Sequence, residues 1–149
     1  MMNGGAAEQG SAAMAEKTVL VVEDNDLNMK LFHDLLEAHG YHILQTKDGM
    51  EALKLAREHH PDLILMDIQL PEISGLEVTK WLKEDDDLKT IPVVVLTTSE
   101  ADEDILKSYQ LHANCYVTKP VDLDKFLTLV KRLEHFWLSI VKLPSRHAV

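Results

Sequence analysis

The sequence predicts an α/β fold in which five parallel strands form one sheet with helices on both faces. Three runs of four large apolar residues, 19–22, 63–66 and 93–96, are typical of strands buried on both faces. Amphipathic segments alternate with these runs, and two shorter apolar segments complete a (βα) unit repeated five times. Such alternation favours parallel strands that are joined by helical crossovers.

The first two units account for the N-terminal half. The strand at 19–22 precedes a helix that is capped by residues 25–26 and ended by Gly40. A short strand over 41–46 and a second helix follow, and that helix stops before Pro61. The spacing predicts that the first helix buries one face, made of Leu27, Leu31, Leu35 and Ala38.

The remaining units follow the central strand, 63–66, which ends on Asp67. A helix over about 74–83 and an acidic loop, 84–87, lead to the strand at 93–96. A helix ending near residue 111 precedes a fifth strand, 115–117. The apolar residues predicted to face the sheet from the last two helices are Ile105, Leu106, Leu123, Phe126, Leu127, Val130 and Leu133.

Length and composition suit one ordinary globular domain. The chain has 149 residues, of which 46% are hydrophobic, and its formal net charge is −10. We expect a disordered tail at 1–16, the folded domain at 17–133, and a helical extension and tail at 134–149. The sequence shows no membrane span and no secretory signal, and its single cysteine fits the cytoplasm. The excess of 25 acidic over 15 basic residues disfavours nucleic-acid binding.

Polar side chains collect at the carboxyl ends of the predicted strands. Glu23 and Asp24 follow the first strand, Asp67 the third, Thr97 the fourth and Lys119 the fifth. Three carboxylates at one edge repel each other unless a cation lies among them, and oxygen ligands suit Mg²⁺. A lysine and a hydroxyl at the same edge would bind phosphoryl oxygens. The set therefore predicts attack by a carboxylate on phosphorus, giving an acyl phosphate.

These motifs resemble the receiver domain of two-component response regulators over about residues 17–133. The resemblance rests on the pair 23–24, the loop 67–75, Thr97 and the Lys119–Pro120 dipeptide. It implies a doubly wound (βα)5 flavodoxin-like fold. It also implies that Asp67 accepts a phosphoryl group from the phosphohistidine of a histidine kinase or phosphotransfer protein. The chain would then be no conventional enzyme, but a phosphoacceptor that supports its own phosphorylation and autodephosphorylation.

The resemblance also implies a metal site and a switch. Asp24, Asp67 and the backbone carbonyl of Gln69 would ligate Mg²⁺ directly, whereas Glu23 would act through a metal-bound water. Thr97 and Lys119 would assist Asp67 at the phosphoryl group. Thr97 would also pair with Tyr116 as a switch, in which the hydroxyl moves to the phosphoryl group and the ring turns inward. A cis bond between Lys119 and Pro120 would direct the lysine at the site.

The two parts of the chain resemble different subfamilies of response regulators. Residues 19–92 are similar to single-domain cell-division regulators of alphaproteobacteria, whereas residues 96–137 look more like the regulators that accompany bacterial phytochromes. We therefore consider a mosaic, natural or engineered, that is joined near Pro92.

Apolar residues continue beyond the last predicted helix of the domain. Two interpretations remain: a longer helix that folds back on its own domain, or an exposed patch that pairs with a second copy. Phytochrome-type regulators use such an extension to form homodimers, which favours the second interpretation. The residues concerned are Phe136, Trp137, Leu138, Ile140, Val141 and Leu143.

Two function classes compete. The leading one is a single-domain binding module, which is controlled by phosphorylation and transmits its signal through a protein surface. The alternative is a Mg²⁺-dependent phosphatase of the aspartyl-phosphate type. That class typically needs an Asp two residues after the nucleophile, where this chain has Gln69. His33 and the pair 59–60 show no ligand spacing that favours a separate metal site.

Overall fold

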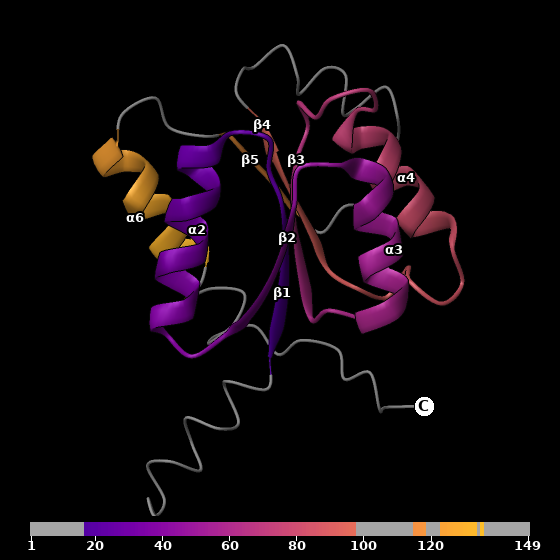
Figure 1. Cartoon of the computed structure of the whole chain (residues 1–149), viewed down its shortest axis with the longest axis horizontal. Helices are drawn as coiled ribbons and strands as arrows, with labels where there is room; N and C mark the ends of the chain where they lie inside the picture. Colours follow the sequence, from indigo (N-terminus) through magenta and orange to yellow (C-terminus); the bar gives the residue numbers. More distant parts are fainter. Residues whose placement is uncertain (1–16, 98–114, 119–122, 134, 136–149) are drawn as a thin grey trace, which may run out of the picture.

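Five parallel strands form a single sheet in the computed structural model, which describes residues 17–97, 115–118, 123–133 and 135 (Figure 1). The strand order is β2-β1-β3-β4-β5, so the predicted central strand does lie in the middle of the sheet. This order confirms the predicted α/β class with a parallel sheet. The strands are β1 (Thr18–Val22), β2 (His42–Thr46), β3 (Leu63–Asp67), β4 (Val93–Thr97) and β5 (Cys115–Thr118).

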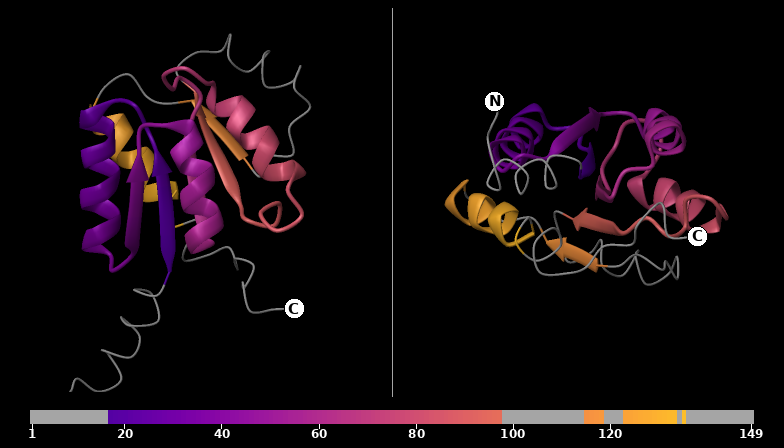
Figure 2. Two further views of the ribbon diagram at one scale, coloured as in Figure 1. Left: turned by 45° about the vertical axis from the view of Figure 1, so that its right-hand side comes forward. Right: turned by 90° about the horizontal axis from the view of Figure 1, so that it is seen from below.

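The described helices cover both faces of the sheet (Figures 1 and 2). α2 (Asp26–Ala38) and α6 (Leu123–Leu133) pack beside each other on one face. α3 (Gly49–His59) and α4 (Gly75–Glu84) pack beside each other on the opposite face. The helix that we expect through Ile105 and Leu106 lies outside the described residues. Within the described part of the chain, no helix is long and apolar enough to cross a membrane.

Alternate residues of the central strands pack into two separate hydrophobic cores, one on each face of the sheet. In β1, Leu20 and Val22 join the core beneath α3 and α4, whereas Val19 and Val21 join the core beneath α2. β3 and β4 divide their apolar side chains between the same two cores. Because both faces are covered, successive positions of such a strand favour apolar residues, and the sequence shows runs rather than alternation.

The buried face of α2 differs from the predicted one. Leu27 is 61% exposed and Ala38 is also exposed, so the predicted face is wrong at both ends. Leu31 and Leu35 are partly buried at the margin of the core. The leucines four residues apart identified a helix correctly, but the residues that the helix buries lie on a different face. The side chains that α2 buries are Met29, Phe32 and Leu36.

Three helices begin at the carboxyl edge of the sheet, each with a side-chain cap. Asn25 caps α2, Asp48 caps α3 and Ser74 caps α4, and in each case the side chain accepts a backbone N–H of the first turn. Each capping residue therefore lies between the loop that follows a strand and the helix that runs back along the sheet. This arrangement collects loops and helix N-termini at the same edge as the strand-end carboxylates.

The predicted acidic loop contacts the end of α3. Asp85 forms an ion pair with Arg57, with 2.8 Å between Oδ2 and Nη1. His60, which adopts φ 46° after α3, lies with Nε2 3.3 Å from Oδ2 of Asp87. Lys83 donates from Nζ to the carbonyl oxygens of Lys89 and Ile91 at 3.2 and 2.8 Å. The loop is thus tied to both neighbouring helices, at the edge of the sheet opposite to the strand-end carboxylates.

Candidate phosphoryl and metal site

Two buried carboxylates end neighbouring strands at the same level. The register pairs Val22 of β1 with Met66 of β3, so Glu23 and Asp67 are the next residues along these two strands. Glu23 is 0% exposed and Asp67 is 4% exposed. Adjacent parallel strands lie about 5 Å apart, so two ionised carboxylates at these positions repel each other strongly. The pair is therefore a site that favours a bound cation.

Asp24 and Gln69 lie beside this pair at the surface. Both residues are exposed; Asp24 lies inside, and Gln69 ends, a short turn in which a buried carboxylate accepts a backbone N–H. The N–H of Asn25 donates to Oε2 of Glu23 at 3.2 Å, and the N–H of Gln69 donates to Oδ1 of Asp67 at 3.2 Å. The local turns thus bring an exposed carboxylate and a loop backbone next to the two buried carboxylates.

The loop after β3 returns tightly to the strand that it leaves. The N–H of Gly75 donates to the carbonyl oxygen of Ile68 at 2.8 Å, and Oγ of Ser74 accepts the N–H of Leu76 at 3.1 Å. Within the loop, Glu72 adopts φ 65°. A Cβ at position 75 would overlap the carbonyl oxygen of Asp67 and lie 2.8 Å from its carbonyl carbon. The glycine predicted to end the loop therefore allows the start of α4 to pack against Asp67.

A cation that the sequence analysis missed lies on the other side of the carboxylates. Lys47 follows β2 and forms an ion pair with Asp26, in the first turn of α2. The hydrogen bond to Asp26 is the main cause that raises the pKa of Lys47, and the charges of Asp26 and Asp24 raise it further. The signal was available: β2 also ends at this edge, and Lys47 is the first residue after it.

The other half of the predicted site is described in part. Thr97 ends β4 and pairs with Thr118 of β5, whereas Tyr116 pairs with Val95. The side chains of Thr97 and Tyr116 lie outside the described part. Lys119 and Pro120, with the predicted cis bond, and the predicted dimer residues Phe136, Trp137, Ile140, Val141 and Leu143 also lie outside the described residues.

The donors that are present fit a hard divalent cation. Glu23 and Asp67 offer carboxylate oxygens at the same level of neighbouring strands, Asp24 and Gln69 follow them in the adjoining loops, and oxygen ligands of these kinds suit Mg²⁺. In the described ranges, no three His, Cys, Asp or Glu side chains are arranged to hold a metal ion by themselves. This finding is compatible with a site that uses two carboxylates, a backbone carbonyl and waters.

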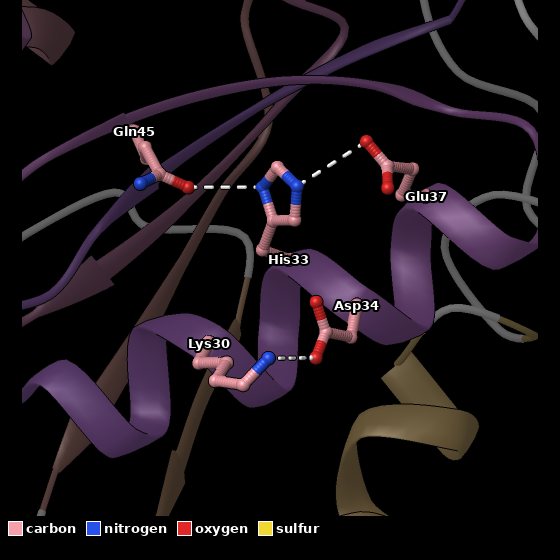
Figure 3. A network of polar contacts seen from close by, with 5 residues as sticks. All are labelled: Lys30, His33, Asp34, Glu37 and Gln45. Carbon is pink, nitrogen blue, oxygen red and sulfur yellow. Dashed lines mark hydrogen bonds and ion pairs between the residues drawn. The ribbon is translucent and has the colours of Figure 1, made fainter.

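His33 lies in a polar network between α2 and the edge strand β2, which Figure 3 shows. Its Nε2 lies 3.2 Å from Oε2 of Glu37, and its Nδ1 lies 3.0 Å from Oε1 of Gln45 in β2. Beside it, Lys30 pairs with Asp34 at 2.8 Å (Figure 3). The network joins a helix to the edge strand and uses both ring nitrogens of His33.

Comparison with known proteins identifies the family. The response regulator receiver domain family matches residues 19–131, so the chain belongs to this family of two-component signalling proteins. The polar-differentiation response regulator DivK of Brucella ovis is 56% identical over 115 residues, which cover 77% of this chain and 94% of the DivK sequence.

Two solved structures of response regulators are also similar. The Mn²⁺-bound form of Rcp1 matches with a TM-score of 0.79 and 38% identity, over 87% of this chain and 99% of the other. The phosphorylated cyanobacterial phytochrome regulator RcpA matches with a TM-score of 0.79 and 42% identity, over the same shares of the two chains. The comparisons thus confirm both resemblances, to DivK and to phytochrome regulators.

The DivK match also bears on the predicted mosaic. Its 115 matched residues exceed the 92 that end at Pro92, so the alignment with one natural relative crosses the proposed junction. The DivK match therefore includes residues on both sides of Pro92, and the mosaic stays a prediction.

Proposed function

We propose that this chain is a phosphoacceptor in a two-component phosphorelay and that Asp67 is the residue phosphorylated. The observation that carries the proposal is the placement of Asp67. This residue is almost fully buried at the carboxyl end of the central strand, beside Glu23 and within one loop of the N-terminus of α4. Membership of the receiver family supports the same role.

The reaction is a transfer of one phosphoryl group. A carboxylate oxygen of Asp67 attacks phosphorus, the P–N bond of the donor phosphohistidine breaks, and the imidazole leaves with the electron pair and takes up a proton. The Gln69 N–H, which already donates to Oδ1 of Asp67, orients the carboxylate for attack from its other oxygen. Thr97 and Lys119 complete the proposed site and bind the oxygens of the transferred group.

Asp24, Asp67 and the carbonyl of Gln69 would ligate Mg²⁺, and Glu23 would act through a bound water. When bound, the ion would neutralise charge that develops on the phosphoryl oxygens. The Mn²⁺-bound Rcp1 structure supports a divalent site in a similar chain. The remaining role of Thr97 is the proposed switch with Tyr116, and a cis bond between Lys119 and Pro120 would set the position of the lysine.

The proposed organisation follows the family. Residues 17–133 form the receiver with the full (βα)5 order, residues 1–16 form a tail, and residues 134–149 extend the last helix. The phosphodonor is a histidine kinase or phosphotransfer protein in the cytoplasm, and a homodimer forms through Phe136, Trp137, Ile140, Val141 and Leu143. The signal leaves through a protein surface, which requires neither nucleic acid nor membrane.

Incubation with acetyl phosphate and Mg²⁺, followed by intact mass spectrometry, tests the proposal. We expect one phosphoryl group on the wild type and none on Asp67→Asn, whereas the matched variant Asp86→Asn, in the exposed acidic loop, is phosphorylated normally. Loss of labelling without Mg²⁺ is also expected. Sustained turnover of simple phosphate esters would instead support the phosphatase alternative, and equal labelling of Asp67→Asn would exclude Asp67 as the acceptor.

A further inference from the structure

We propose that the ion pair between Lys47 and Asp26 modulates the affinity of the carboxylate site for Mg²⁺. The positive charge of Lys47 competes with the metal ion for Asp24, and Asp26 holds that charge at the rim of the site. The inference rests on the proposed function, because it assumes that the carboxylates bind a divalent cation. It assigns a role to two residues that are not among the proposed ligands.

The strand register places Lys47 next to the carboxylates. Val22 of β1 pairs with Thr46 of β2, and the N–H of Glu23 donates to the carbonyl oxygen of Thr46 at 3.1 Å. Lys47 therefore follows β2 at the level where Glu23 follows β1. Its side chain contacts Asp26, which is two residues beyond Asp24. The pair thus spans the two loops that border the site on the side away from β3.

The electrostatics of the pair act on the proposed metal ligand. Besides the hydrogen bond and charge of Asp26, the charge of Asp24 contributes to the raised pKa of Lys47. The interaction is mutual, so Lys47 lowers the local negative potential that attracts a cation to Asp24. Because the side chains of Lys47 and Asp26 are 52% and 83% exposed, water and salt screen the effect and keep it moderate.

Titration calorimetry with MgCl₂ on the full chain measures the effect directly. At low ionic strength, we expect Lys47→Met to bind Mg²⁺ about two- to fivefold more tightly than the wild type, the range typical of one exposed charge. We expect Asp26→Asn to bind more weakly by a similar factor, because it removes a negative charge and releases the lysine. Both differences should vanish near 1 M salt, where the Debye length is about 3 Å.

The pair formed by Lys89 and Asp86 provides a matched control. Its lysine is 53% exposed and lies 3.1 Å from a carboxylate oxygen of the acidic loop, at the opposite edge of the sheet. We expect Lys89→Met, with the same change in net charge as Lys47→Met, to leave the Mg²⁺ affinity unchanged. An equal shift in both variants would overturn the inference, because it would reduce the effect to net charge.

The two proposals fail in different ways. Suppose that the wild type binds Mg²⁺, that Asp24→Asn weakens this binding and that Lys47→Met leaves it unchanged. The inference about Lys47 is then wrong, and the proposed function stands. If the wild type does not bind Mg²⁺ under any of these conditions, the proposed metal site is wrong and the inference falls with it. Circular dichroism of each variant confirms that the comparison concerns folded protein.

Discussion

The start of α4 packs against the backbone of Asp67 so closely that Gly75 has no room for a side chain. A Cβ there would overlap the carbonyl oxygen of Asp67 and lie 3.1 Å from Cα of Ile68. The atoms that obstruct it are backbone atoms, which cannot rotate away. Gly75 is thus a packing requirement of the site, because it fixes the distance between the central strand and the helix that follows it.

Gly75→Ala should therefore destabilise the fold and displace Asp67. We expect the free energy of unfolding to fall by about 3 kcal/mol, the upper part of the usual range for overpacking. Gly49→Ala is a suitable comparison, since a Cβ there would meet the side-chain methyl groups of Val78 and Ile73 at 2.6 and 2.7 Å. Side chains can adjust, so we expect a smaller loss. Urea unfolding measures both, and equal stability of Gly75→Ala and wild type would contradict this packing.

Asp85 should make stability depend on pH in the acid range. The backbone N–H of Asp87 is the main cause that lowers the pKa of Asp85 from 3.8, and Arg57 and the N–H of Leu88 lower it further. A carboxyl with a lower pKa in the folded state binds fewer protons there than in the unfolded chain. Its contribution is therefore present above pH 3.8 and lost as the pH falls through the folded value.

The variant Asp85→Asn isolates this contribution. Thermal unfolding should show the variant less stable than the wild type at neutral pH, with the difference closing as the solution is acidified below pH 3.8. Asp86→Asn, one residue further along the same loop, is the control. A difference that stays constant down to the lowest pH would argue against a role for the charge of Asp85.

Lys83, a cationic group, should make stability depend on pH in the alkaline range. Burial lowers the pKa of Lys83 below 10.5, although its ammonium donates to two backbone carbonyl oxygens. Over the range between the folded value and 10.5, the unfolded chain binds more protons, so stability rises with pH. We expect the wild type to gain stability relative to Lys83→Met as the pH rises toward 10.5. Urea unfolding across this pH range measures the difference, and Lys80→Met, at an exposed position of the same helix, is the control variant.

The C-terminal extension should decide the oligomeric state. If residues 136–143 form a self-complementary apolar patch, the full chain is a dimer and truncation after Leu133 gives a monomer. A stable pair would need about 1,200–2,000 Å² of buried surface. Light scattering measures the molar mass of both chains, and a dimer that survives the truncation would refute the role of the extension.

Much of the fold could be predicted because two-sided burial leaves a clear pattern. The runs in β1, β3 and β4 are apolar throughout, and Asn25, Asp48 and Ser74 mark where helices begin. The face of α2 was harder to predict, because leucines occur around much of the helix and the sequence pattern does not show which side meets the sheet. In the folded protein, packing against the sheet buries Phe32 and leaves Leu27 exposed.

The candidate site shows a similar division. Glu23 and Asp67 could be placed side by side from the sequence, because the carboxyl ends of parallel strands meet at one edge. Lys47 was missed, since its importance depends on an ion pair with Asp26 that joins separate loops. The need for Gly75 was also hidden, because a close approach between backbones leaves no trace in composition or periodicity.

Chemical mapping of the phosphorylated residue tests the central claim most directly. The chain is phosphorylated with acetyl phosphate and Mg²⁺, the acyl phosphate is reduced with borohydride, and the resulting homoserine is located by peptide mass spectrometry. We expect homoserine at position 67, no homoserine at Asp24 or at the aspartates of the acidic loop, and no 2-amino-5-hydroxyvalerate, the reduction product of a glutamyl phosphate, at Glu23. Either alcohol at another carboxylate, with position 67 unmodified, would contradict the proposed role of Asp67.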